Sequence, residues 1–307
     1  MQKFKTLLLL SLLLISGCIT KDHNQLTIAL DYSPNINYIG IYMAIHQGYY
    51  QQDNVNINLI NASSISTEQL VITNQANLGV SYSENLLFSD TKLPLTSIYS
   101  LYTQNLSGFI SKTDKNITSI KDFANKTYCG WGSEAEKKII TTTAKENGVD
   151  PSSINIVNTD HNLINDNGSC DIFWSYEYWS NKQAKFNGID YNYIPLSSLN
   201  LNYYTPIIIS KTNDTDPLYS LFIKNTIKGF NDAINDPQLA INVMHQYDQQ
   251  IPDQVIIDSL EAIKNYINPT GYQDPIIWEQ LYNWAITNNL NPQSLEGVFT
   301  NEYITNQ

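Results

Sequence analysis

Carboxylate and aromatic side chains repeatedly follow short apolar runs in this chain, and they are the residues best suited to chemistry. Asp31 and Tyr32 follow the run 26–30, Tyr82 and Glu84 lie at the end of the run 78–82, and Glu177 follows the run 171–174. A carboxylate at the end of a buried strand needs solvent or a partner, and an aromatic face can hold a flat ring. The pattern predicts a binding site.

The predicted site combines ring faces with hydrogen-bond acceptors. A ligand amine that donates to Glu84 or Glu177 in a dry cleft would gain about 1.5–3 kcal/mol per charge-assisted bond. We therefore expect a planar, amine-bearing ligand that is neutral or cationic. The predicted ligand-binding residues are Asp31, Tyr32, Asn35, Tyr38, Tyr82, Glu84, Trp131, Gly132, Ser133, Trp174, Tyr176, Glu177 and Tyr204. Any one of the aromatic residues could instead fill the hydrophobic core, and that alternative stays open.

The turn Gly130-Trp131-Gly132-Ser133 is predicted to open a helix. Ser133 would be the N-cap and Glu136 its reciprocal partner in a capping box. Backbone N–H groups beside Gly130 and Gly132 could also donate to a carbonyl or formyl oxygen of a ligand. The sequence allows both roles.

Signatures of catalysis and of cofactor binding are absent from the sequence. It contains no Gly-x-Ser-x-Gly elbow and no glycine pattern of a dinucleotide or phosphate-binding loop. Its four histidines and the cysteines Cys129 and Cys170 show no spacing of metal ligands. We therefore expect a protein that is not an enzyme and that has neither a cofactor nor a metal site. Cys129 and Cys170 could form a disulfide or remain two buried thiols.

Segments typical of strands and of helices alternate along most of the chain, which predicts an α/β fold. The length exceeds what one compact core usually holds, so we expect two α/β lobes that form a clamshell. Each lobe would be a mainly parallel sheet flanked by helices, with lobe 1 formed by 26–110 plus 211–307 and lobe 2 by 111–210. A ligand in such a clamshell lies at the carboxyl ends of the strands that face the cleft.

The first residues are typical of a secretory signal followed by a lipid anchor. Lys3 and Lys5 precede a short apolar run that ends at Ser16-Gly17-Cys18. We predict that 1–17 is a signal peptide, that Cys18 carries lipid, and that 18–25 is a tether on the outer face of the cytoplasmic membrane. An ordinary signal peptide that happens to contain a cysteine is the alternative.

The charge balance excludes several classes of partner. Removal of 1–17 takes two lysines from the 17 basic residues and none of the 29 acidic residues, which leaves a net charge of −14. Nucleic acid is therefore not an expected partner. Every basic residue counted is a lysine, so the chain has no guanidinium to grip a phosphate at two points. A phosphate ester is not an expected ligand.

Five motifs in register resemble ABC-importer receptors for pyrimidine precursors of thiamine. They are Leu30-Asp31-Tyr32-Ser33-Pro34-Asn35 with Gly40-Ile41-Tyr42-Met43-Ala44, Gly79-Val80-Ser81-Tyr82-Ser83-Glu84, Tyr128-Cys129-Gly130-Trp131-Gly132-Ser133, Asp171-Ile172-Phe173-Trp174 with Tyr176, and Leu201-Asn202-Tyr203-Tyr204-Thr205-Pro206. Tyr32 stands where the family usually has tryptophan. The resemblance covers about residues 26–290, and it implies the fold of a two-lobed type II periplasmic-binding-protein clamshell. It also implies a ligand such as formylaminopyrimidine or hydroxymethylpyrimidine, captured by closure of the lobes.

The same resemblance implies partners and leaves two alternatives. The partners would be an ABC permease and its ATPase, and we expect the receptor to be a monomer. One alternative is a receptor for another small solute of the sulfonate or nitrate class. The other is an enzyme similar to the fungal-type pyrimidine synthase, although the chain lacks the cysteine-rich motif of that enzyme.

Overall fold

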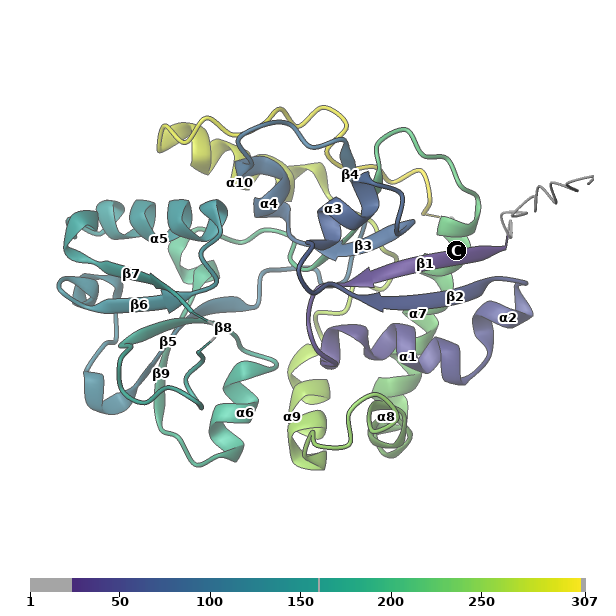
Figure 1. Ribbon diagram of the computed structural model, residues 1–307, viewed down its shortest axis with the longest axis horizontal. Helices are drawn as coiled ribbons and strands as arrows, with labels where there is room; N and C mark the ends of the chain where they lie inside the picture. The colour runs from purple at the N-terminus through teal and green to yellow at the C-terminus, as the bar shows by residue number, and fades with distance from the viewer. Residues whose placement is uncertain (1–23, 160, 305–307) are drawn as a thin grey trace, which may run out of the picture.

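Short apolar strands and intervening helices build two five-stranded sheets that lie side by side, each flanked by helices (Figure 1). The computed structural model describes residues 24–159 and 161–304. The predicted α/β architecture of two lobes is confirmed. Cys18 and the predicted signal peptide lie outside the described residues.

The sheet of lobe 1 has the strand order β2-β1-β3-β10-β4. Its strands are β1 (Gln25–Leu30), β2 (Asn56–Asn61), β3 (Leu78–Ser81), β4 (Leu95–Ser100) and β10 (Ile207–Lys211). Strand β1 pairs in parallel with β2 and β3, whereas β10 is antiparallel to both β3 and β4. The single antiparallel strand is the one that returns from the other lobe.

The sheet of lobe 2 repeats this arrangement in the order β7-β6-β8-β5-β9. Its strands are β5 (Ser107–Lys112), β6 (Thr127–Gly130), β7 (Asn155–Asn158), β8 (Ile172–Tyr176) and β9 (Tyr191–Pro195). Strand β6 pairs in parallel with β7 and β8, and β5 is antiparallel to β8 and β9. Each sheet is therefore mainly parallel with one strand reversed.

The strand pairing places both lobe boundaries earlier in the chain than the sequence predicted. Strand β5 lies in the sheet of lobe 2 and β10 in the sheet of lobe 1, so the chain crosses at 101–106 and returns at 196–206. The sequence placed these crossings near 110 and 210. An apolar run shows that a strand is buried but carries no information about which sheet it joins, and this is why both boundaries were placed too late.

Ten α-helices cover the sheets in the described part of the chain. They are α1 (Ile39–His46), α2 (Tyr49–Gln52), α3 (Thr67–Ile72), α4 (Ser83–Phe88), α5 (Glu134–Glu146), α6 (Ser180–Phe186), α7 (Leu218–Asn235), α8 (Pro237–Met244), α9 (Asp253–Ile263) and α10 (Pro275–Thr287). Helix α1 ends just before Gly48, whose φ of 71° is the left-handed conformation that glycine adopts without a steric cost. None of these helices is long and apolar enough to cross a membrane.

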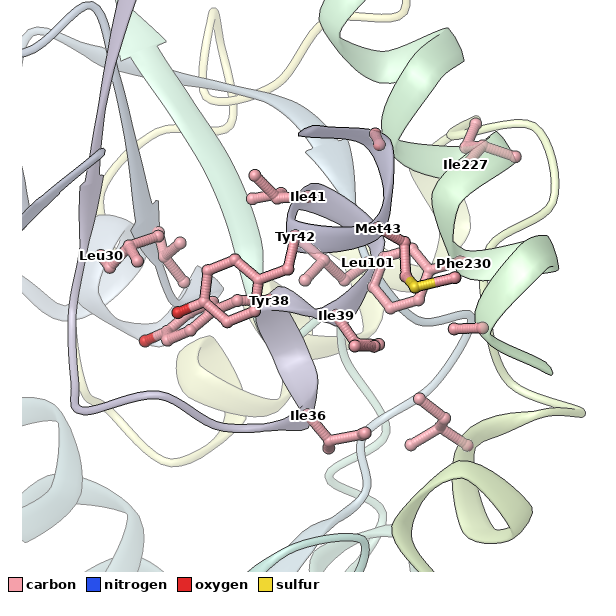
Figure 2. Packing of buried hydrophobic residues seen from close by; sticks show 14 of the residues in the cluster. Leu30, Ile36, Tyr38, Ile39, Ile41, Tyr42, Met43, Leu101, Ile227 and Phe230 are labelled. Carbon is pink, nitrogen blue, oxygen red and sulfur yellow. The ribbon is translucent and has the colours of Figure 1, made fainter. Parts of the chain in front are cut away.

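The core of lobe 1 depends on close contact between α1 and α7 (Figure 2). A Cβ atom on Gly229 would lie 2.0 Å from the carbonyl oxygen of Gly40, so the two backbones can approach only because residue 229 is glycine. A Cβ atom on Gly40 would lie 2.3 Å from the ring of Phe230. Ile39, Met43 and Phe230 fill the space around this crossing and are fully buried. Tight packing here fixes Tyr38, which precedes α1 and lies at the cleft.

A disulfide joins Cys129 of β6 to Cys170, two residues before β8, with Cα atoms 5.9 Å apart. Both cysteines belong to a small cluster with Ile110, Phe173 and Ala184 in lobe 2. The bond settles the alternative that the sequence left open, and it closes the part of the chain that carries α5 and β7.

The two lobes touch on both sides of the cleft. On one side, Glu146 of α5 accepts hydrogen bonds from Trp284 Nε1 (3.3 Å) and Asn288 Nδ2 (2.7 Å). On the other side, Lys185 of α6 pairs with Asp258 of α9 at 3.5 Å. Between them, the two crossing segments are joined because Asn105 Nδ2 donates to the carbonyl of Leu201 at 3.1 Å.

Candidate functional site

Asp31 lies at the centre of a hydrogen-bonded group at the carboxyl end of β1. Its Oδ1 accepts a bond of 2.7 Å from the hydroxyl of Tyr38, and its Oδ2 accepts one from the hydroxyl of Tyr82. Tyr82 follows β3, the strand next to β1, which is why these side chains converge at one edge of the sheet. The three predicted residues therefore do come together, as part of lobe 1.

Ring faces from the two lobes meet across the cleft. Tyr82 of lobe 1 and Tyr176 of lobe 2 are stacked, with ring centroids 6.5 Å apart and planes inclined by 21°. Deeper in lobe 2, Trp131 contacts Trp174 edge to face at 5.4 Å. Trp131 is 47 % exposed whereas Trp174 is 9 % exposed, so the pair leads from the surface into the interior. Four of the predicted aromatic residues thus line the interface between the lobes.

Buried polar atoms without a hydrogen-bond partner in the described protein are found at the same place. They include Glu84 Oε2, Trp174 Nε1 and the hydroxyls of Tyr178 and Tyr203, none of which makes a hydrogen bond of ordinary length. Tyr203 is nevertheless close enough to lower the pKa of Glu84, and Asn37 is close enough to lower the pKa of Tyr178. The charge of Glu84 acts on Tyr176, Tyr178 and Tyr203, which locates all four side chains close together. A buried polar atom that lacks a partner costs about 1–3 kcal/mol. These groups can therefore bind a ligand that supplies matching donors and acceptors.

The electrostatics of the cleft favour a neutral acid or a bound cation. Burial raises the pKa of Glu84 to about 8. Burial also raises the pKa of Asp31, although the hydrogen bonds from Tyr38 and Tyr82 act in the opposite direction. The nearby charge of Glu68 raises the pKa of both carboxyls further. Among the described residues, no lysine forms an ion pair with any of these three acids.

The turn after β6 is fixed by hydrogen bonds to Glu136. This corrects the prediction that the N–H of Gly132 is free to donate to a ligand. The N–H of Gly132 donates to Oε2 of Glu136 at 2.8 Å, and Oε1 of the same carboxylate accepts from the hydroxyl of Tyr128. Ser133 is the N-cap as predicted, because its Oγ accepts from the N–H of Glu136 at 3.1 Å. The Gly132 N–H is therefore already used, and the backbone N–H of Ser133 also lowers the pKa of the Glu136 carboxyl, as the predicted capping box implies.

Gly130 has no room for a side chain because Glu136 fills it. A Cβ atom there would lie 1.7 Å from Oε1 of Glu136. Glu136 is 3 % exposed, and burial raises the pKa of its carboxyl. It is a positioning residue, since it fixes the turn that presents Trp131.

We expect Glu136→Gln to lower the free energy of unfolding by about 1–3 kcal/mol. The carboxylate accepts two hydrogen bonds, from the Tyr128 hydroxyl and the Gly132 N–H, and in glutamine the amide NH₂ would face one of these donors. Urea unfolding at pH 7 measures this change. Ser133→Ala is the control for the helix cap alone and should cost about 1 kcal/mol. A change below roughly 0.5 kcal/mol for the glutamine variant would contradict the role assigned to Glu136.

Three predicted residues, Tyr204, Glu177 and Tyr32, lie away from the buried polar group. Asn35 is buried, and its side chain lowers the pKa of Tyr38, which bonds to Asp31. Asn35 caps the turn that follows it by accepting from the N–H of Asn37 at 2.9 Å. The hydroxyl of Tyr204 accepts from the N–H of Asp274 at 2.8 Å, on the side of Trp278. Glu177 is exposed, and its charge acts on Tyr193 of β9. Tyr32 is 60 % exposed at the rim.

Tyr178 and Tyr203 were absent from the predicted site although both have buried hydroxyls there. Side chains at alternate positions of an extended strand point to the same face. Trp174 and Tyr176 follow this period in β8, whereas Tyr178 lies in the turn after the strand. The neighbours Tyr203 and Tyr204 have different surroundings, since Tyr203 lies near Glu84 and Tyr204 bonds to Asp274.

A family model and two known proteins match most of the chain. A family model described as NMT1/THI5 like matches residues 35–240. The formylaminopyrimidine-binding protein of Halalkalibacterium halodurans is 21% identical over 308 residues, which cover 92% of this chain and 93% of that protein. The riboflavin-binding protein RibY of Chloroflexus aurantiacus is also 21% identical, over 91% of this chain and 86% of that protein.

Solved structures share the fold at lower identity. The alkanesulfonate-binding protein SsuA from Xanthomonas axonopodis pv. citri, bound to MOPS, superposes with a TM-score of 0.69 at 12% identity, over 90% of this chain and 98% of that chain. This likeness confirms the predicted clamshell. Because one fold hosts many ligands, the ligand must be argued from the residues of the cleft.

Proposed function

Because the chain belongs to the NMT1/THI5-like family, we propose that it is the solute receptor of an ABC importer and binds a pyrimidine precursor of thiamine. Formylaminopyrimidine and hydroxymethylpyrimidine are the ligands that its motifs imply. The observation that carries the proposal is the buried Oε2 of Glu84, which lies among aromatic rings of both lobes. It makes no hydrogen bond of ordinary length, and the hydroxyl of Tyr203 is close enough to lower the pKa of this carboxyl. A flat ring with an exocyclic amine supplies the donor that this atom needs.

The acids of the cleft argue against the sulfonate or nitrate alternative. An anion would lie near Asp31, Glu68 and Glu84, and the chain has no arginine to neutralise it. Two unit charges of like sign at about 4 Å repel by roughly 4 kcal/mol near a protein surface. The relative that binds formylaminopyrimidine is consistent with the same conclusion.

Binding by hinge closure is supported by two aromatic rings that come from different lobes. Tyr82 belongs to lobe 1 and Tyr176 to lobe 2. In the described part of the chain, the backbone passes between the two sheets only at the two crossing segments. A ligand that contacts both rings stabilises the arrangement in which the lobes meet. The closed form would then be recognised by a permease and its ATPase. Lipid on Cys18 would keep this monomeric receptor at the outer face of the cytoplasmic membrane.

Calorimetric titration of the mature protein tests the proposal directly. We expect 4-amino-5-hydroxymethyl-2-methylpyrimidine to bind in preference to taurine, nitrate and riboflavin, and to be recovered unchanged. Preference for taurine or nitrate would indicate the anion receptor instead. Turnover of the bound pyrimidine, followed by mass spectrometry, would indicate an enzyme.

We expect Tyr176→Leu to weaken pyrimidine binding about three- to tenfold, because an offset or edge contact between aromatic rings contributes about 0.5–1.5 kcal/mol beyond buried area. Tyr176→Phe keeps the ring and should bind within about twofold of the wild type. Titration of both variants measures the difference. Equal affinity for the leucine and phenylalanine variants would remove Tyr176 from the stack.

A further inference from the structure

A cavity of about 270 Å³ opens between the lobes beside the proposed pyrimidine site. Lobe 1 contributes Glu68, Gln69 and Asn85 to its wall, and lobe 2 contributes Ser133 and Glu134. The cavity is therefore formed by the ends of α3, α4 and α5 and exists as one space only when the lobes are together. A substituent that enters it would contact both lobes.

The cavity lies next to the carboxyls of the aromatic site. Oε1 of Glu68, in the wall of the cavity, bonds to Ser81 and Asn85, which precede and follow the segment from Tyr82 to Glu84. Ser133 belongs to the turn that presents Trp131. Glu68 lines the cavity, and its charge acts on both Asp31 and Glu84. A ring held at Glu84 would thus have a neighbouring space for its substituent.

The polar groups of the cavity favour a donor with positive charge. Oε1 of Glu68 is held in place by Ser81 Oγ at 2.5 Å and Asn85 Nδ2 at 3.0 Å. The side chain of Glu134 is exposed and forms no hydrogen bond or ion pair with the rest of the described chain. No lysine lines the cavity; the Nζ of Lys138, nearby on α5, donates to the carbonyl of Phe88 at 2.7 Å.

We propose that this cavity is a second subsite, which rests on the proposed function and takes a positively charged amine on a substituent of the bound pyrimidine. Glu68 and Glu134, from opposite lobes, would both accept from the ammonium. The natural ligand would then be an aminopyrimidine with an amine-bearing side arm, in addition to or in place of the bare ring. Contact with both lobes would favour their closed arrangement.

Three synthetic ligands with equal arms on C5 of 4-amino-2-methylpyrimidine test the subsite by calorimetric titration at low salt. The arms are 3-aminopropyl, 3-hydroxypropyl and 2-carboxyethyl, and 5-hydroxymethyl is the short reference. We expect the amine to bind about fivefold tighter than the hydroxyl arm, and the carboxylate to bind weakest. The advantage of the amine should shrink at 1 M salt, since exposed charges are screened.

A matched pair of variants tests whether Glu134 binds the amine of the ligand. Glu134→Gln should remove the advantage of the amine and leave the affinity for the 5-hydroxymethyl reference unchanged. Glu302→Gln makes the same charge change beside Tyr303, which bonds to Asp214 at the end of lobe 1 remote from the cleft, and should leave the advantage intact. Equal affinities for all three arms, with the reference still bound, would overturn the subsite alone. No binding of the reference or of any arm would overturn the proposed function as well.

Discussion

Glu84→Gln is expected to weaken pyrimidine binding about ten- to hundredfold at pH 8. One charge-assisted hydrogen bond to a buried acceptor contributes about 1.5–3 kcal/mol, and each 1.4 kcal/mol is a factor of ten in affinity. Oε2 of Glu84 is buried without a hydrogen bond of ordinary length, so a ligand donor can approach it beside the hydroxyl of Tyr203. The amide of glutamine retains the shape but loses the charge. Isothermal titration of the two proteins measures the loss.

The same carboxyl should make binding depend on pH. Burial raises the pKa of Glu84 to about 8, so the free protein holds this acid mainly protonated at pH 6. A ligand amine favours the ionised form, and the proton must therefore leave when the ligand binds. Affinity should rise with pH between 6 and 8, by at most tenfold per unit, and level off above pH 8. The glutamine variant should show no such rise.

Glu177→Gln is the matched control for this prediction. Its sequence position suggested the same role as Glu84, and on that basis we would expect an equal loss. The structure leaves Glu177 exposed on the side of β9, so we expect an affinity within about twofold of the wild type. If Glu177→Gln rather than Glu84→Gln abolished binding, the site would have to be placed on the other face of β8.

Several parts of the fold and site could be read from the sequence because they depend on local rules. The alternation of strands and helices predicted two α/β lobes, and the motif around Asp31, Tyr82 and Trp131 predicted the family, which the match to residues 35–240 confirms. Strand ends in a parallel sheet share one edge, so Asp31 and Tyr82 could be placed together before the structure was known.

Other parts of the fold and site could not be predicted, because they depend on which surface a side chain faces. To know that surface, one needs the pairing register of strands that are distant in the sequence. Glu84 and Glu177 both follow strands, yet only Glu84 is buried between the lobes. Tyr203 and Tyr204 are neighbours in the chain, and only the structure shows that the hydroxyl of Tyr204 accepts a bond from the N–H of Asp274. The pairing of β5 with β8 likewise could not be deduced from an apolar run.

Replacement of both bridged cysteines, Cys129→Ser with Cys170→Ser, should lower the free energy of unfolding by about 2–4 kcal/mol. The bond spans a sequence separation of 41, and closing a loop of that length removes entropy from the unfolded chain worth up to about 4 kcal/mol. The loop contains α5 and β7, so lobe 2 should lose the most stability. Denaturant unfolding of the wild type and the double variant measures the difference.

The bond should matter for stability far more than for ligand affinity, because its cluster with Ile110, Phe173 and Ala184 contains none of the polar groups assigned to the ligand. Pyrimidine binding by the double serine variant should therefore remain within about threefold of the wild type at 10 °C, where the variant is still folded. A reductant should destabilise the wild type by a similar amount and leave the double variant unaffected. Two reactive thiols in the denatured, unreduced mature protein, apart from Cys18, would instead show that the bond does not form.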